Sequence, residues 1–79
     1  MFERVSIDPK IAGGKPTIRG TRIPITMILE LLEDGLTFDQ IRRDYYPQLT
    51  AEDIKACIEY ANALVQGEEI HVVEESAGR

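Results

Sequence analysis

The sequence predicts a mainly α fold in which a short N-terminal β-ribbon arm is followed by a three-helix bundle. The first 24 residues alternate short apolar segments with glycine and proline, which is typical of strands joined by turns. Beyond them, apolar residues recur at intervals of three and four, and capping residues and glycines mark three helices. We expect one domain of 79 residues, divided into an arm (1–24), a tri-helical bundle (25–66) and an acidic C-terminal tail (67–79).

The arm contains two candidate strands. Val5 and Ile7 alternate with polar residues, the pattern of a strand with one buried face. Thr17–Ile18 and residues 21–23 flank Gly20, so a tight ribbon is expected there. Because two strands alone are marginal in water, the arm must pack on the helices or pair with another chain.

Helix boundaries are marked by residues with specific backbone preferences. The first helix is expected to start near Pro24 and to end at Gly35. Its apolar stripe comprises Ile25, Ile28, Leu29, Leu31 and Leu32. The second helix starts with Thr37 as cap and Gln40 three residues later, and it ends before Pro47. Its buried side is marked by Phe38, Ile41 and Tyr45.

The third helix is expected to start at Thr50, with Asp53 in its first turn, and to end at Gly67. Its expected buried stripe comprises Ile54, Cys57, Ile58, Ala61, Leu64 and Val65. The tail that follows has a short apolar centre, Ile70 to Val73, between pairs of glutamates. It is expected to be a short strand or a segment that orders on a partner.

Charge is distributed unevenly along the chain, whose net charge is −5. Residues 1–22 carry five basic and two acidic side chains, whereas residues 23–79 carry four basic and twelve acidic ones. An acidic body repels nucleic acid and is better matched to a basic protein partner. Alternatively, both parts are merely solvated.

The composition favours a soluble cytoplasmic protein without membrane contact. The single cysteine, Cys57, excludes an internal disulfide and fits a reducing compartment. No apolar run is long enough to span a membrane, and the first ten residues lack the apolar core of a signal peptide.

Nothing in the sequence indicates an enzyme. His71 is the only histidine and falls in the tail, while Cys57 falls on the buried stripe of the third helix. One cysteine and one histidine do not make a zinc site. The glycines of residues 13–20 follow neither of the common phosphate-binding patterns. We predict no catalytic, cofactor-binding or metal-binding residues and no cofactor.

Nucleic-acid binding is conceivable because helices two and three have the order of a helix-turn-helix. The connection at residues 46–50 is slightly too long for that motif. The third helix also presents Glu52, Asp53 and Glu59 with only Lys55 positive, so the basic arm is the better candidate. Predicted DNA-binding residues are Lys15, Arg19, Arg22, Arg42 and Arg43. Alternatively, Arg19 and Arg22 pair with acids such as Glu30 or Asp34, or hold the arm onto the first helix.

The segments GGKP (13–16) and RGTRIP (19–24), with DYYPQLT (44–50), resemble a small bacterial family formerly of unknown function. That family is placed among homeodomain-like helix-turn-helix proteins and is described as antitoxin-like, of VapB type, encoded beside PIN-like nuclease toxins. The likeness extends from about residue 5 to residue 65. It implies an N-terminal ribbon involved in dimerisation, a homeodomain-like bundle, and an arm shaped by its glycines and Pro16, with Arg19 and Arg22 exposed.

We therefore expect a homodimeric antitoxin that neutralises a cognate nuclease toxin and also represses its own operon by binding operator DNA. An acidic polypeptide can block the basic substrate groove that an RNA-cutting toxin needs. Candidate toxin-binding residues are Glu68, Glu69, Ile70, Val72, Val73, Glu74 and Glu75. The alternatives are a DNA-binding regulator without a toxin partner and a structural protein-interaction module.

Overall fold

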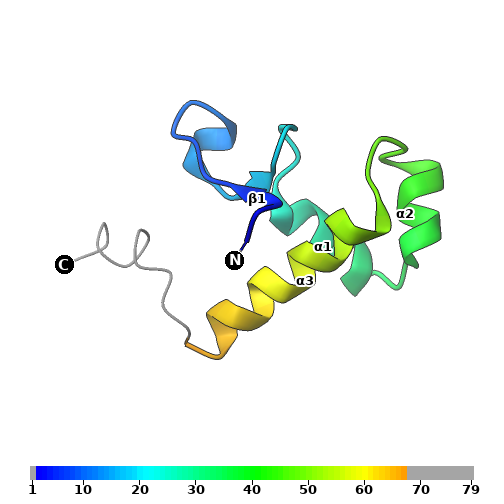
Figure 1. Ribbon diagram of the computed structural model, residues 1–79. Helices are drawn as coiled ribbons and strands as arrows, with labels where there is room; N and C mark the ends of the chain where they lie inside the picture. Colours follow the sequence, from blue (N-terminus) through cyan, green and yellow to red (C-terminus); the bar gives the residue numbers. More distant parts are fainter. Residues whose placement is uncertain (1, 68–79) are drawn as a thin grey trace.

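A computed structural model describes residues 2–67 of the chain. Three helices pack against a small antiparallel strand pair (Figure 1). In chain order the elements are β1 (Val5–Ser6), the 3-10 turn η1 (Ala12–Gly14), β2 (Thr17–Ile18), α1 (Ile25–Glu33), α2 (Phe38–Asp44) and α3 (Ala51–Val65). The predicted mainly α class is confirmed, and each helix begins and ends where its sequence signals place it.

Reciprocal caps fix the starts of α2 and α3. The Thr37 hydroxyl accepts from the Gln40 amide at 3.1 Å, and the Gln40 side chain accepts from the Thr37 amide at 2.8 Å. Thr50 and Asp53 repeat this arrangement at 3.1 and 2.9 Å. Each box satisfies two amides that a helix start otherwise leaves without partners. Gly35 follows α1 with φ +94°, the left-handed backbone expected of a helix stop.

The arm packs on the helices. Residues Val5, Ile18 and Ile23 are buried in the same core cluster as the helix residues. The expected tight turn around Gly20 forms, since the Ile18 amide donates to the Ile23 carbonyl and a bridge joins Thr17 to Pro24. In addition, β2 pairs along its length with β1. Ile7 was expected to be buried and is 40% exposed, since β1 ends at Ser6 and the alternation does not continue.

The core is formed mainly by one side of each helix. Ile28, Ile41 and Ile54 come from α1, α2 and α3 and are fully buried. Leu29 and Leu32 are only partly buried against this core. The expected burial of Tyr45 is wrong, since its side chain is 52% exposed. Tyr45 is the residue that caps the end of α2, where the backbone has left helical geometry, so it no longer follows the helix stripe.

Half of the expected stripe on α3 is also wrong. Its buried residues recur every third position, as Ile54, Cys57, Tyr60 and Ala63. Ile58, Leu64 and Val65 are exposed by 41, 46 and 85%. Steps of three fall short of a 3.6-residue turn, so the buried line winds around the helix toward β1. There the ring of Phe2 packs edge-on against Tyr60, with centroids 5.3 Å apart.

Candidate binding surfaces

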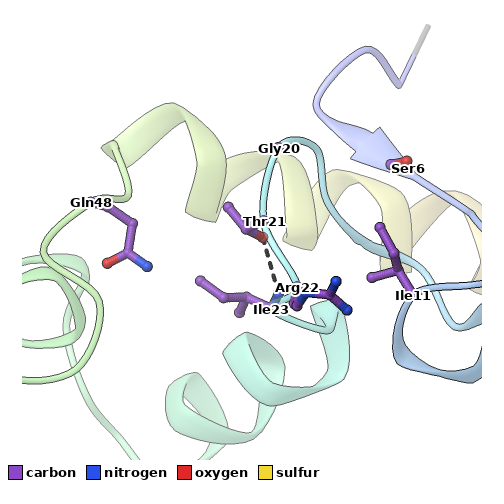
Figure 2. Close-up of a pocket in the computed structure, with 7 residues that line it drawn as sticks. All are labelled: Ser6, Ile11, Gly20, Thr21, Arg22, Ile23 and Gln48. Atoms are coloured by element: carbon purple, nitrogen blue, oxygen red, sulfur yellow. Dashed lines mark hydrogen bonds between the residues drawn. The ribbon is translucent and has the colours of Figure 1, made fainter.

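An open groove of about 590 Å³ lies between the arm and the loop that joins α2 to α3 (Figure 2). The arm contributes the β1 end, the inter-strand loop and the turn after β2, and the α2–α3 loop contributes one glutamine. Lining residues are Ser6, Ile11, Gly20, Thr21, Arg22, Ile23 and Gln48. The groove thus joins segments up to 42 residues apart, from Ser6 to Gln48.

The turn after β2 is held rigidly by its own threonine. The Thr21 hydroxyl donates to the Ile18 carbonyl at 2.7 Å and accepts from the Ile23 amide at 3.0 Å. The Ile18 amide in turn donates to the Ile23 carbonyl at 3.0 Å. Gly20 has φ +81°, a conformation that glycine adopts without strain. This turn therefore presents the neighbouring Arg22 from a fixed backbone.

The groove is free of negative charge on its lining. None of its seven lining residues is a carboxylate, although the chain has 14 aspartates and glutamates. Arg22 is exposed and forms no ion pair with any residue between 2 and 67. Arg42 donates from Nε to the Leu49 carbonyl at 2.9 Å, which places its guanidinium beside the loop that carries Gln48. Both cations are thus available to an anionic group.

The other predicted DNA-binding residues lie elsewhere or are engaged. Arg19 donates to the carbonyls of Glu3 and Val5, the latter at 3.0 Å, and so clasps the segment that contains β1. Arg43 forms an ion pair with Asp44 at 3.0 Å, and this carboxylate raises the pKa of the guanidinium. Lys15 is exposed in the loop between the strands. The alternative pairing of Arg19 or Arg22 with Glu30 or Asp34 is not seen within residues 2–67.

Sequence reasoning missed an ion pair between the arm and α3. Arg4 contacts Asp53 at 3.0 Å, and Asp53 also caps the helix through Thr50. Partial burial alone raises the pKa of Asp53, but hydrogen bonds from the Thr50 amide, the Arg4 guanidinium and the Thr50 side chain outweigh it and hold this pKa below its usual value. One carboxylate therefore joins the arm to the start of α3. Their separation of 49 residues left no local sequence signal.

Comparison with known proteins decides the family. A family model described as "Protein of unknown function (DUF433)" matches residues 5–61. The chain belongs to this family. A crystal structure of a DUF433 member from Anabaena variabilis is similar over 90% of this chain and 69% of that one, with a TM-score of 0.72 and 28% identity. The chain is also 34% identical over 61 residues to the uncharacterized protein y4eO of Sinorhizobium fredii, and it spans only 27% of that relative.

The family match contains the whole groove and excludes the acidic segment, residues 68–75. The candidate toxin-binding residues fall in this segment and lie outside the described residues. Immediately before it, α3 ends with Leu64 and Val65 exposed, and Gly67 follows with φ +78°. The described part of the chain thus presents an apolar helix end directly ahead of four glutamates.

The titratable groups of the described residues show no arrangement suited to nucleophilic catalysis. Cys57 is 1% exposed, and desolvation together with the nearby Asp53 raises its pKa to about 12, so it stays a thiol at neutral pH. His71 lies outside the described residues. Within residues 2–67, no group of three or more potential ligands gathers to hold a metal ion. None of the helices described is long and apolar enough to span a membrane.

Proposed function

We propose that this DUF433 protein is a non-enzymatic, antitoxin-like binding module of the cytoplasm. Its acidic C-terminal region binds and silences a cognate, basic PIN-like nuclease, and its three helices form a homeodomain-like bundle that carries this region. The single observation behind the proposal is the exposed apolar end of α3, with Leu64 and Val65, which leads directly into the acidic segment.

Charge and hydrophobicity together make this end suited to a basic protein. Four glutamates flank the apolar residues Ile70, Val72 and Val73, and the exposed side of α3 adds Glu52 and Glu59 against one lysine, Lys55. A nuclease must hold phosphates in a positively charged groove, so complementary carboxylates steer association and compete with its substrate. Exposed apolar side chains contribute further free energy when the partner covers them.

Binding to operator DNA is the second candidate, and it corresponds to autoregulation of an operon or to a regulator without a toxin. It is favoured by the groove, whose lining lacks carboxylates and where Arg22 and Arg42 lie near Gln48. Against it stands the acidic exposed side of α3, which would meet phosphates with repulsion. A third possibility, a purely structural module, predicts neither binding activity.

Co-expression with the adjacent gene product tests the first candidate. The wild-type chain should copurify with a nuclease and suppress its RNA cleavage. Replacing Glu68, Glu69, Glu74 and Glu75 by glutamine should abolish both effects. A matched variant neutralises four exposed acids elsewhere, namely Glu30, Glu33, Asp34 and Asp39. This variant should still copurify with the nuclease and suppress its RNA cleavage. Equal loss in the two variants, or no copurification at all, would refute the proposal.

The DNA candidate has a separate test. Replacing Arg22 by alanine should weaken binding to the upstream promoter and reduce the dependence of the affinity on salt by about one phosphate contact. Replacing Arg43, which already pairs with Asp44, should change affinity less. An identical salt dependence in wild type and in the Arg22 variant would exclude the groove as a DNA site.

A further inference from the structure

The groove and the acidic segment carry opposite charge. Arg22 lines the groove, Lys10 precedes the lining residue Ile11, and Arg42 lies beside the loop of Gln48. None of these three cations forms an ion pair within the described part of the chain. The segment 68–75 contributes four carboxylates. Two such surfaces on one polypeptide attract each other within or between molecules.

Their apolar parts also correspond. Ile11 and Ile23 provide apolar side chains to the lining of the groove, and its polar side chains are those of Ser6, Thr21, Arg22 and Gln48. In the segment, Ile70, Val72 and Val73 stand between the two glutamate pairs. A peptide that is apolar at its centre and acidic on both sides thus matches a groove whose lining contains two isoleucines and Arg22 and lacks carboxylates.

The length of α3 separates the start of the segment from the α2–α3 loop at the groove. Gln48 lies just before the start of α3, and Gly67 lies just after its end. With a rise of 1.5 Å per residue, α3 separates Thr50 from Gly67 by about 25 Å. The six residues from Gly67 to Val73 span at most about 20 Å when fully extended. Measured along α3, the apolar centre therefore stops short of the loop that carries Gln48, which favours a second molecule as its donor.

We propose that the groove receives residues 68–75 of a second copy of this chain, whose glutamates contact Arg22 and whose apolar centre covers Ile11 and Ile23. In a two-fold symmetric pair the exchange is reciprocal, so each contact forms twice. This docking does not depend on the nuclease. If the proposed function also holds, the paired state occupies the segment that binds the nuclease, and toxin and groove compete for it.

Analytical ultracentrifugation of the full chain without any nuclease tests the docking. The wild type should form dimers whose dissociation constant rises with salt, because the contact is electrostatic. Arg22→Glu should raise that constant about tenfold or more. Lys15→Glu makes the same charge change on an exposed arm residue that does not line the groove, and it should have less than one third of this effect.

Charge exchange and a peptide separate this contact from other interfaces. Changing Glu68, Glu69, Glu74 and Glu75 to lysine should weaken dimers of the wild type but restore those of Arg22→Glu. A synthetic peptide of residues 67–79 should dissociate wild-type dimers. Because Arg22 makes no side-chain hydrogen bond within residues 2–67, its variant should keep the wild-type melting temperature at concentrations where both proteins are monomeric. A second variant, Gln48→Glu, should weaken dimers in the same way.

Three outcomes would overturn the proposal. The first is a monomer at every concentration in low salt. Another is a dimer equally stable in Arg22→Glu and Gln48→Glu, because the copies would then meet elsewhere, for example through the exposed end of α3. Failure of the charge exchange to restore association is the third. None of these results bears on nuclease copurification, so the two proposals fail independently.

Discussion

Replacing Arg19 by alanine tests whether this residue holds the arm together or is free to bind a ligand. Its guanidinium donates to the carbonyls of Glu3 and Val5, and its own amide donates to the Arg4 carbonyl at 2.8 Å. Alanine keeps the amide contact and removes the two side-chain bonds. At about 0.5–1.5 kcal/mol for each intramolecular hydrogen bond, the expected loss of stability is about 2 kcal/mol.

Such a loss is large for a chain of this size. A change of 1 kcal/mol shifts the melting temperature of a 60–100-residue domain by roughly 4–8 °C, so Arg19→Ala should melt roughly 8–16 °C below the wild type. Urea unfolding followed by circular dichroism at 222 nm measures the same quantity through its midpoint. Arg19→Lys should recover only part of the loss, because an ammonium cannot reproduce the planar fork of the guanidinium.

Arg22→Ala is the matched control, because Arg22 lies three residues further on and makes no side-chain hydrogen bond to the described residues. It should leave the melting temperature unchanged at concentrations where the chain is monomeric. Equal stabilities of Arg19→Ala and Arg22→Ala would refute the structural role of Arg19 and return it to the candidate ligand-binding residues.

The remaining predictions concern α3. Ile54→Ala should cost about 2–5 kcal/mol in unfolding free energy because this side chain is fully buried, whereas Ile58→Ala, at a side chain 41% exposed, should cost less than about 1 kcal/mol. Thr50→Ala should cost about 1 kcal/mol through loss of the cap, measured by urea unfolding. Because the folded-state pKa of Asp53 is lowered, its stabilisation is present above its unfolded pKa of about 3.9 and is lost as pH falls through the folded value. Asp53→Asn should therefore destabilise the protein at pH 7, with a difference from wild type that shrinks at pH 3; a difference independent of pH would contradict this. Cys57 should react with a thiol reagent at pH 8 only when the protein is unfolded, and rapid reaction in the native state would disprove its burial.

Features that depend on neighbouring residues could be predicted from the sequence. The cap at Thr37 is predicted from Gln40 three residues later, and the stop at Gly35 is predicted because the apolar stripe of α1 ends just before this glycine. These local signals gave all three helices and their boundaries. The burial of Cys57 followed from the same periodicity.

Features that depend on distant segments could not be predicted. Nothing near Tyr60 in the sequence indicates that Phe2 packs on it, so the apolar periodicity predicts a buried line one position away from the observed one in the second half of α3. The ion pair of Arg4 with Asp53 joins residues 49 apart. The groove likewise arises only where the turn after β2 meets the α2–α3 loop, and its basic character was visible in the sequence only as a charged arm.

The most direct test of the account is the affinity of the acidic segment for the adjacent nuclease, measured by isothermal titration calorimetry at low and physiological salt. We predict tight binding that weakens with salt. Neutralising Glu68, Glu69, Glu74 and Glu75 should raise the dissociation constant about fourfold or more, since each exposed ion pair contributes about 0.2–1 kcal/mol. Equal affinity with and without these four charges would contradict it.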